Sequence, residues 1–557
     1  MTTEITVRDL VVNHFRRAGL EPVNVEVRTF PGETIAIVNV DHDYERAIKI
    51  AKELDDQIEN GFVSVRESAK IQGSTQHQPV ASIHDPRIPR LIELLNSRAR
   101  TSENQPSLRY VPDVAERINL AVAARHHLIF GRRGVGKTAL LLEAKRLVET
   151  QGAYTLWVNM HSLRSLDKTK AFLTVAARLC DLGIGAFQAG ASSQSGIGLL
   201  KSARERIDEL LYQRTPVSSD VSALVPHMQQ ALSRFCLETK QPIFIFLDDV
   251  HYFDMQSVPG FLDLLHGVTR DNPVWLKIAG IQHQMHWFMP NPPTGLQTGH
   301  DAAIINLDIT LEQPELAKQF LQDVLRGYVE ECDASPARAF LSASAVDRLV
   351  LASGGVPRDF LTLCSSSLQT ARRRSNARTV GVQDVNNAAG VAAQAKLQEL
   401  EDDAAAARGR SEALVSALQT IREFLLNEQQ ITFLRVDFRD KESHPKEYGL
   451  MQALADLRML HLINGSLSDA HHAGHRSEVY LLDLSQYSGS RLKQKLHVLD
   501  LEWGHIVFKR TRSHETPRIA DSPRKLVEIL RRGPVLELHK LSAIVSDSAA
   551  QAMPEGS

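Results

Sequence analysis

Apolar side chains recur at helical or strand-like spacing through the first 70 residues of the chain. Helices are expected where they recur every three to four residues, and strands where they alternate with polar ones. Pro31-Gly32 separates two of the strands, as in a hairpin turn. The predicted elements are a helix at Val7–Ala18, strands at Val23–Phe30 and Thr34–Val40, a helix at Asp43–Ile58 and a strand at Phe62–Val65. We therefore expect a small N-terminal α/β domain over residues 1–70, without a catalytic constellation.

A second pattern, in which short apolar strands alternate with helices, begins after a polar stretch. Residues 71–105 start with Gln, Ser, His and Pro and are predicted to be a linker. Strands that alternate with helices are typical of a parallel sheet with crossover helices. The predicted strands are Leu128–Phe130, Leu156–Asn159, Ile243–Leu247 and Val274–Ile281. This alternation predicts an α/β core over residues 106–310, and the helical patterns beyond it predict a helical domain over residues 311–395.

One glycine-rich segment, Leu182–Ser219, lengthens the predicted core. It contains Gly183, Gly185, Gly190, Gly196 and Gly198 together with several serines. Such a composition is typical of flexible chain, so a flexible insertion is predicted here. A tolerated surface loop is slightly favoured over a loop that contacts a partner or DNA.

The last part of the chain mixes a short helix, strands and a basic end. A helix is predicted at Pro445–Leu462, within a domain over residues 396–490. Its apolar stripe comprises Leu450, Leu454, Leu457 and Leu460. Residues 491–557 are predicted to be a basic C-terminal extension, because Lys509–Arg532 carries eight Lys or Arg residues against three acidic ones. A solvated tail and contact with nucleic-acid phosphates both remain open.

The composition limits the partners and the compartment. Hydrophobic residues make up 43% of the 557 residues and charged residues 23%, as in ordinary globular proteins. The net charge of −2 gives no global positive field, so nucleic acid would have to bind a local patch. The four cysteines form no CxxC pair, which excludes a disulfide scaffold or zinc ribbon and favours a reducing compartment. With no signal-peptide pattern and no apolar run of membrane length, we expect a cytoplasmic protein without membrane contact.

The strongest chemical signal is a glycine-rich loop between a predicted strand and a predicted helix. Residues 131–138, Gly-Arg-Arg-Gly-Val-Gly-Lys-Thr, fit the pattern GxxxxGK[ST]. Glycines let backbone N–H groups face phosphates, and the helix N-terminus adds a favourable dipole. Lys137 is expected to reach the β- and γ-phosphates, and the Thr138 hydroxyl to ligate Mg²⁺. The residues predicted to bind ATP are Gly131, Arg132, Arg133, Gly134, Val135, Gly136, Lys137, Thr138 and Ala139.

A pair of acids follows the apolar strand Ile243–Leu247. The carboxyl ends of strands are where α/β sheets place their ligands. Asp248 is expected to hold Mg²⁺ directly or through water, and Asp249 to orient or deprotonate the attacking water. A strand that ends in two acids is often only a capped strand, but the glycine-rich loop favours the functional interpretation.

These motifs together carry a resemblance to a known class. Gly131–Thr138 and Leu247–Asp254 resemble the AAA+ and STAND P-loop ATPases, and within them the bacterial origin-recognition-complex-like ATPases. Ser353–Arg358 looks like the start of the sensor-2 helix, and Thr379–Ala388 like the start of the last lid helix. The resemblance implies an AAA+ core, a helical lid, bound ATP and Mg²⁺, and homo-oligomers. Residues 396–490 resemble a winged-helix domain.

The sequence departs from this resemblance at two places. The strand ends in Asp-Asp, as in STAND proteins, where AAA+ proteins have Asp-Glu. Because the carboxylate of Asp249 is on a shorter side chain, slow hydrolysis is expected. Gln282 and His283 stand where AAA+ proteins usually have Asn, Ser or Thr as sensor 1, which puts that role in doubt.

Two arginines are candidates for catalytic roles by position. Arg358 follows Pro357 at a predicted helix start, from which it could reach the γ-phosphate and couple the lid to the nucleotide; a structural arginine is the alternative. Arg270 ends the predicted helix Val258–Thr269 and could complete a neighbouring subunit's site as an arginine finger. A cation is also favoured there simply by the helix dipole.

We therefore expect an ATP-hydrolysing molecular switch that oligomerises and acts on or near DNA through a separate effector protein. Antiphage defence and mobile-element regulation are both plausible settings. Two alternatives remain open: a DNA-binding initiator or transcription regulator with a mainly structural nucleotide, and an adaptor scaffold that binds ATP without turnover. Mixed charge on the helix at Pro445–Leu462 makes protein contact a rival to contact with duplex DNA.

Overall fold

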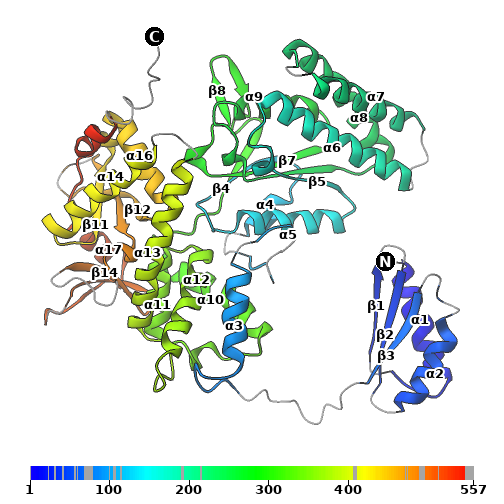
Figure 1. Ribbon diagram of the computed structural model, residues 1–557, viewed down its shortest axis with the longest axis horizontal. Coiled ribbons are helices and arrows are strands. Elements are labelled where there is room, and N and C mark those ends of the chain that lie inside the picture. Colours follow the sequence, from blue (N-terminus) through cyan, green and yellow to red (C-terminus); the bar gives the residue numbers. More distant parts are fainter. Residues whose placement is uncertain are drawn as a thin grey trace. The chain divides into compact units, whose positions relative to one another are not determined.

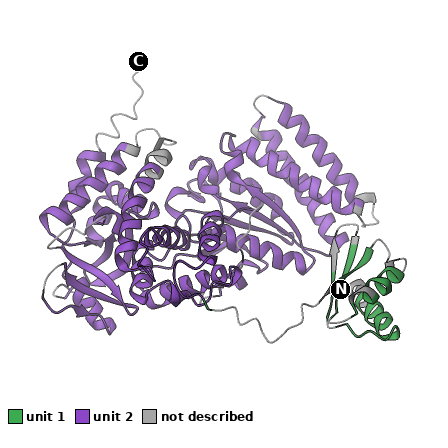
Figure 2. Ribbon diagram, turned by 60° about the horizontal axis from the view of Figure 1, so that its bottom comes forward, with its two compact units in different colours: residues 1–79 green, residues 80–557 purple. Residues whose placement is uncertain are grey.

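A computed structural model describes most of the chain, and Figure 1 shows its elements. The described residues are 2–22, 24–30, 33–40, 43–55, 58, 61–67, 79–99, 101–103, 108, 110–112, 116–189, 194–213, 216–405, 410–470, 472, 474–488, 496–511 and 514–545. The chain divides into two compact units, residues 1–79 and 80–557 (Figure 2). The finer division of the second unit into core, lid and C-terminal domains remains a prediction.

The N-terminal unit is a small α/β fold, as the sequence predicts. Its elements are α1 (Thr2–Arg17), β1 (Asn24–Phe30), β2 (Glu33–Val40), α2 (Tyr44–Asp55) and β3 (Gly61–Glu67). Strand β2 lies in the middle, antiparallel to β1 and parallel to β3. Alternate residues of β2, including Ala36 and Val38, are fully buried in one core with Phe15 of α1 and Leu54 of α2. The predicted turn at Pro31-Gly32 lies outside the described residues.

A five-stranded sheet forms the centre of the second unit. Its strands are β4 (His126–Phe130), β5 (Tyr154–Asn159), β6 (Ile243–Asp248), β7 (Val274–Gly280) and β10 (Ala302–Asn306). They are arranged in the order β10-β4-β7-β6-β5, and every neighbouring pair is parallel. All residues of β4 and β6 are buried, because helices cover both faces of such a sheet. The α/β class and the parallel core predicted from the sequence are confirmed.

Helices and short turns join these strands. They are α4 (Arg117–Ala121), α5 (Lys137–Thr150), η1 (Met160–Leu163), η2 (Val250–Tyr252), α9 (Val258–Thr269) and η3 (Gln282–Gln284). A small hairpin, β8 (Phe288–Pro290) and β9 (Pro293–Gly295), precedes β10. The helix predicted at Val258–Thr269 has the same bounds as α9.

The described residues of the glycine-rich insertion are largely helical, which corrects the prediction of a flexible loop there; Gly190 lies outside the described residues. Helices α6 (Lys168–Ala189), α7 (Gln194–Tyr212) and α8 (Ser218–Thr239) pack side by side beside the sheet (Figure 1). Two glycines are points of close helix contact: a Cβ on Gly183 would be 2.6 Å from Leu200, and one on Gly196 would be 2.8 Å from Phe187. Glycine is needed there to let side chains approach a neighbouring backbone, and not to make the chain flexible.

The helical lid follows the sheet and is joined by a helix from the stretch predicted to be a linker. Its helices are α10 (Pro314–Glu331), η4 (Ala337–Ala339), α11 (Ala343–Ser353), α12 (Pro357–Arg372) and α13 (Val382–Ala405). Helix α3 (Arg87–Ser97) packs against α10 and α12 and buries Ile88, Leu91 and Leu95 in the lid core. The predicted linker therefore ends before Arg87, because the apolar stripe of α3 needs a partner.

Residues 410–486 form a C-terminal module of helices and an antiparallel sheet. Its elements are α14 (Arg410–Arg422), η5 (Glu423–Glu428), β11 (Phe433–Asp437), α15 (Phe438–Ser443), α16 (Pro445–Asp456), β12 (Leu460–Ser468), β13 (Arg476–Leu482) and η6 (Leu484–Gln486). The sheet order is β11-β13-β12. The predicted helix was too long: α16 ends at Asp456, Arg458 turns the chain at a φ of 63°, and Leu460 and Leu462 belong to β12.

Helix α16 has little exposed surface. It packs against α14, against η3 of the ATPase core and against η7 (Leu538–Leu541). From Glu447 to Asp456 every residue is buried or half-buried. Neighbouring elements therefore cover most of this helix from Glu447 to Asp456.

The described residues of the predicted basic extension, 496–511 and 514–545, are folded, which corrects the prediction for this part of the chain. Its elements are β14 (His497–Glu502), β15 (His505–Arg510), β16 (Arg518–Ile519), α17 (Pro523–Leu530) and η7. Leu499, Leu530 and Leu538 are buried in the same core as the lid and the C-terminal module. Half of the eight cations in 509–532 have carboxylate partners: Lys509 with Asp500 and Glu502, Arg510 with Glu515, Arg524 with Glu528, and Lys525 with Asp521.

The described residues also bear on the expectations about membrane contact and metal binding. One helical stretch, Lys168–Gln188 in α6, is long and apolar enough to cross a membrane, and more than half of its most apolar window is buried inside the structure. The described residues contain no group of three or more His, Cys, Asp or Glu side chains that could hold a metal ion. All four cysteines are buried and unbonded to one another.

Candidate functional site

The glycine-rich loop links the end of β4 to the start of α5, as predicted. Gly134 and Gly136 have φ angles of +81° and +104°, which side chains with a Cβ rarely adopt. Helix α5 begins at Lys137, so the N-terminal end of the helix lies at this loop. The backbone therefore has the cradle shape and the helix dipole that favour an anion.

Lys137 is buried within the loop. Its Nζ donates hydrogen bonds to the carbonyl oxygens of Gly131 at 2.8 Å and Arg132 at 3.1 Å. Burial lowers the pKa of Lys137 to about 8, although the charges of Asp249, Asp308 and Asp248 oppose this. A phosphate close to the ammonium would favour its charged form, so the site is suited to an anionic ligand.

Thr138 and Asp248 meet across the loop. The Thr138 hydroxyl donates to Asp248 Oδ2 at 2.9 Å, and Asp248 is only 2% exposed. Burial, with a contribution from the neighbouring Asp249 carboxylate, raises the pKa of Asp248 to about 7. A hydroxyl and a carboxylate are the hard oxygen ligands that Mg²⁺ prefers. These two residues therefore fit the predicted magnesium site.

Asp249 lies next to this pair in an unusual backbone conformation. Its φ is 58°, in the left-handed region, where it caps the short turn η2. It is half-buried and lines the main cavity of the site. A non-glycine residue held in this region is commonly a feature of functional sites.

The lid contributes Arg358 to the same cavity. The Arg358 backbone N–H donates to the Gly134 carbonyl at 3.3 Å, and a Cβ on Gly134 would be 2.8 Å from Arg358 Cβ. Glycine at 134 thus allows the first turn of α12 to approach the loop. The position predicted for a lid sensor is at the glycine-rich loop, and Arg358 lines the cavity.

The side chain of Arg132 makes its contacts away from the cavity, and its predicted part in ATP binding stays a prediction. Its Nε pairs with Asp308 at 3.0 Å, and its Nη2 donates to the carbonyls of Ile309 and Gly354, both at 3.1 Å. The side chain is buried, and neither Arg132 nor Gly131 lines the cavity. The Arg132 side chain therefore ties the loop to the lid instead of facing the ligand.

Arg270 and the sensor-1 candidates lie outside the cavity lining. Arg270 is exposed after α9, just before β7 begins, at the opposite edge of the sheet from the acids that end β6. Gln282 and His283 follow the end of β7, but the described residues that line the cavity include neither. A role of Arg270 in a neighbouring subunit remains a prediction.

The cavity has a volume of about 930 Å³ and extends beyond the predicted motifs. The lining residues that sequence reasoning missed include Arg98, Tyr110, His251, Phe320, Tyr328 and Lys396. They come from the segment before the core, from η2 and from the lid, so no single sequence motif contains them. His251 is the exception, since it comes two residues after the acid pair in the chain.

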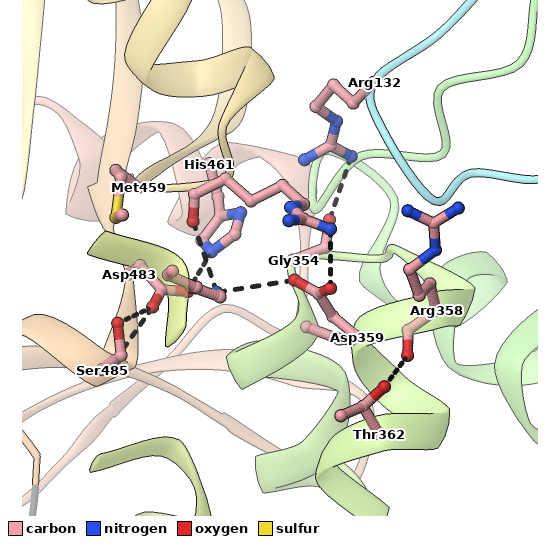
Figure 3. Close-up of polar contacts among 12 residues, drawn as sticks. Arg132, Gly354, Arg358, Asp359, Thr362, Met459, His461, Asp483 and Ser485 are labelled. Atoms are coloured by element: carbon pink, nitrogen blue, oxygen red, sulfur yellow. Dashed lines mark hydrogen bonds and ion pairs between the residues drawn. The ribbon is translucent and has the colours of Figure 1, made fainter. Parts of the chain in front are cut away.

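A buried charge network connects the lid to the C-terminal module (Figure 3). Arg458 donates to Asp359 of α12 at 2.9 Å, and Lys396 of α13 lies between Asp483 at 3.0 Å and Asp359 at 3.5 Å. His461 Nε2 is 2.7 Å from Asp483 Oδ2. Burial acts to raise the pKa of Asp483, but Lys396 and His461 hold it below its ordinary value. These contacts hold the lid to the C-terminal module at Asp359, the residue that follows Arg358.

A second buried acid, Asp456, ends α16 near the glycine-rich loop. Burial raises its pKa to about 7, with a further rise from Asp308, while Lys137, Arg132 and Arg133 act to lower it. Within the part of the chain that the structure describes, its Oδ2 has no hydrogen-bond partner. The C-terminal module is thus within electrostatic reach of the loop cations as well as of the lid.

Three comparisons with known proteins bear on this site. None of the curated proteins compared with the chain is similar to it. Among solved structures, the chain is similar to the Orc1 protein of Aeropyrum pernix in complex with DNA, at 16% identity and a TM-score of 0.34, covering 68% of this chain and 91% of that one. It is also similar to a Walker-type ATPase of Pyrococcus abyssi, at 14% identity and a TM-score of 0.40, covering 68% and 97%.

A RuvB variant of Thermotoga maritima is similar at 14% identity and a TM-score of 0.29, covering 57% of this chain and 80% of that one. All three TM-scores are below 0.5, so these similarities do not indicate the function of this chain. The family model described as "AAA ATPase domain" matches residues 113–276, which span the glycine-rich loop, the acid pair and the strands that hold them. This part of the chain is therefore a domain of the AAA ATPase family.

Proposed function

We propose that this chain is an ATP-binding and hydrolysing molecular switch. The observation that carries the proposal is a single cavity in which the buried Lys137 and the lid residue Arg358 line the walls beside the Thr138–Asp248 pair. In this proposal Lys137 binds the β- and γ-phosphates, and Arg358 reaches the γ-phosphate. Thr138 and Asp248 hold Mg²⁺, which when bound neutralises charge on the phosphate oxygens.

Asp249 is proposed to orient or deprotonate the attacking water. It lines the cavity next to the magnesium pair, and its backbone lies in the left-handed region. Because general-base catalysis depends on hydrogen-bond reach to the water, a carboxylate one methylene shorter than glutamate is expected to work slowly. Slow turnover suits a switch, since the ATP-bound state then persists.

Two variants separate binding from hydrolysis. ATP at about 100 times its Kd should stabilise the wild-type fold by about 2.7 kcal/mol, and Lys137→Ala should lose that ATP-dependent rise in melting temperature. Asp249→Asn should keep the rise but release phosphate far more slowly than the wild type. An unchanged ATP-dependent rise in the Lys137 variant would sink the binding assignment, and wild-type turnover in the Asp249 variant would remove its catalytic role.

The output of the switch is proposed to be the C-terminal module. Arg132 connects the loop to Gly354, and Asp359 connects α12 to Arg458 (Figure 3). A movement of Arg358 toward a γ-phosphate would therefore be transmitted to the module through buried contacts, which have few alternative arrangements. The nucleotide state would then set whether α16 stays covered.

For the biological role we retain the expectation of a cytoplasmic homo-oligomer that acts on or near DNA through a separate effector protein. The chain supplies the nucleotide switch, and the effector would supply any further chemistry. Antiphage defence and mobile-element regulation both suit such a protein. The alternatives are a DNA-binding initiator or regulator with a mainly structural nucleotide, and a scaffold that binds ATP without turnover.

Phosphate release measured with and without duplex DNA separates these roles. The switch should hydrolyse ATP and change its rate when its effector or DNA is present. A regulator with a structural nucleotide should bind DNA equally in ATP and ADP, and a scaffold should show the ATP-dependent stabilisation without any phosphate release.

A further inference from the structure

His251 is a buried imidazole at the site that the proposed roles do not use. It lies in η2, three residues after Asp248, and its side chain is only 3% exposed. It lines the cavity, yet neither ring nitrogen has a hydrogen-bond partner among the described residues. Its Nδ1 lies 4.0 Å from Asp249 Oδ1, about an ångström beyond a hydrogen bond.

Buried polar groups in folded proteins are normally hydrogen-bonded, so an orphaned pair of nitrogens calls for an explanation. Packing alone does not provide one, because a phenyl ring would fill the same space without burying two polar atoms. Burial lowers the pKa of His251 well below its ordinary value, and the nearby charges of Lys137 and Arg133 add to this. The ring is thus neutral, with one nitrogen that donates and one that accepts.

Asp249 is the natural partner. It stands two residues before His251, has a φ of 58°, and is the N-cap residue of the short turn that contains His251. A small adjustment of that turn would bring Nδ1 and Oδ1 into hydrogen-bond distance, and catalytic hydrogen bonds are often long before the ligand binds.

Of the described segments that follow β6 and β7, only η2 places a side chain in the cavity beside Asp249. Gly280 ends β7, and a Cβ there would be 3.8 Å from the His251 backbone nitrogen, so the turn lies close against the strand end. The residues that follow β7 in the sensor-1 position, Gln282 and His283, do not line the cavity. His251 does, and it is next to the residue proposed to handle the water.

We propose that His251 is a positioning residue that donates a hydrogen bond from Nδ1 to Asp249 Oδ1 and orients this carboxylate toward the attacking water. The inference rests on the proposed ATPase function. The imidazole keeps its proton throughout, and the proton of the water goes to Asp249. Orientation matters here because the short aspartate has less reach than a glutamate and because small misplacements of a catalytic group reduce rates strongly.

Three substitutions at one position test the assignment. His251→Phe keeps the ring shape without hydrogen bonds, His251→Asn places an N–H close to the position of Nδ1, and His251→Gln places one close to Nε2. Steady-state phosphate release gives kcat and KM, and thermal shift gives ATP binding. The Phe variant should lose about 10- to 100-fold in kcat with unchanged KM, and the Asn variant should recover more of the rate than the Gln variant.

His161→Phe is the matched control, because His161 contacts the same Tyr252 ring as His251, with ring centroids 4.7 Å apart, but is exposed and does not line the cavity. It should retain wild-type turnover. Wild-type kcat in His251→Phe overturns the inference, and so does equal impairment of the Phe, Asn and Gln variants.

A structure of the wild-type protein with Mg²⁺, ADP and beryllium fluoride provides a test that does not need turnover. The Nδ1–Oδ1 distance should shorten from 4.0 Å to hydrogen-bond length. If the distance stays near 4.0 Å, His251 does not position Asp249. Failure of the proposed function itself would look different: wild-type protein would show no nucleotide-dependent stabilisation and no phosphate release that depends on Lys137.

Discussion

Gly354 lies so close to His461 that a Cβ on the glycine would overlap the imidazole ring. Gly354 ends α11 at a φ of 57° and begins the turn that leads to Arg358. His461 belongs to β12 and is hydrogen-bonded to Asp483. The turn that presents the lid arginine is thus in direct contact with the C-terminal module.

Gly354→Ala should loosen this contact. A side chain at positive φ costs about 1–3 kcal/mol, and overlap with His461 adds to it, so the free energy of unfolding should fall by at least that amount. Thermal or denaturant unfolding measures the change. Gly327→Ala in α10 is the matched control, because a Cβ there would have nothing within 4 Å. It should be neutral or stabilise by up to about 1 kcal/mol, and equal losses in both variants would contradict the contact.

Asp456→Asn should stabilise the protein more at high pH than at low pH. The pKa of Asp456 is raised to about 7 by burial, so the folded state keeps a proton that the unfolded state releases between about pH 4 and 7. The stability from this proton is complete below pH 4 and is lost as the pH rises through 7. At pH 8 the neutral Asn should therefore raise the melting temperature, with about 4 kcal/mol as the upper bound, and at pH 5 it should give only about a third of that gain.

Melting temperatures at pH 5 and pH 8 test this difference. Glu331→Gln, an exposed position in α10, serves as the control and should respond little at either pH. A gain for Asp456→Asn that is the same at both pH values would mean that the buried carboxylate does not titrate in this range.

Arg270→Ala should impair ATP hydrolysis only if subunits complete one another's sites. An arginine finger supplied by a neighbour is worth about 10³-fold or more in rate. A mixture of Arg270→Ala with Lys137→Ala should recover part of the activity, because one subunit offers the arginine and the other the intact loop. A protein that stays monomeric in saturating ATP at micromolar concentration would remove the basis for this role.

Duplex DNA, if it binds, should contact the exposed cations of the last folded segment. Arg518 and Arg532 are exposed, whereas half of the cations in this segment already have carboxylate partners. Each phosphate contact contributes about −0.9 to the slope of log affinity against log salt, so reversing both charges to glutamate should flatten the slope by about two.

Gel-shift titrations at several salt concentrations, in ATP and in ADP, measure this slope. The double variant Arg178→Glu, Lys201→Glu changes the net charge equally at exposed positions of α6 and α7 and should leave the slope unchanged. No salt-dependent binding in either nucleotide would favour a protein partner for this part of the chain. Deletion of the segment is a poor test, because β14 and β15 are part of the folded core.

The sequence predicts best where one pattern has one structural meaning. The fully buried strand β6 could only be an apolar run, and the glycine-rich loop places Lys137 and Thr138 by spacing alone. The acids that end β6 meet the loop because parallel strands end at a common edge. These parts of the fold were predicted correctly, and the structure brings Lys137, Thr138 and Asp248 together; their roles stay predictions.

The errors arise where one residue type serves two purposes. Gly183 and Gly196 read as loop residues, but they permit close contacts between helices, which depend on Leu200 and Phe187 far along the chain. Arg132 reads as part of the phosphate loop, and its real partners, Asp308 and Gly354, are 176 and 222 residues away. The charges near the end of the chain look like a solvated tail in the sequence. Their carboxylate partners, and the core that buries the apolar residues between them, are brought together only by folding.

The covered position of α16 limits how tightly any ligand that needs this helix can bind. Such a ligand engages only open molecules, so its apparent dissociation constant is the intrinsic one divided by the open fraction. With about one molecule in a hundred open, the apparent affinity is weaker by about a hundredfold. A nucleotide that raises the open fraction would then tighten binding without touching the ligand. The surface of α16 would bind the ligand weakly in one nucleotide state and more tightly in the other.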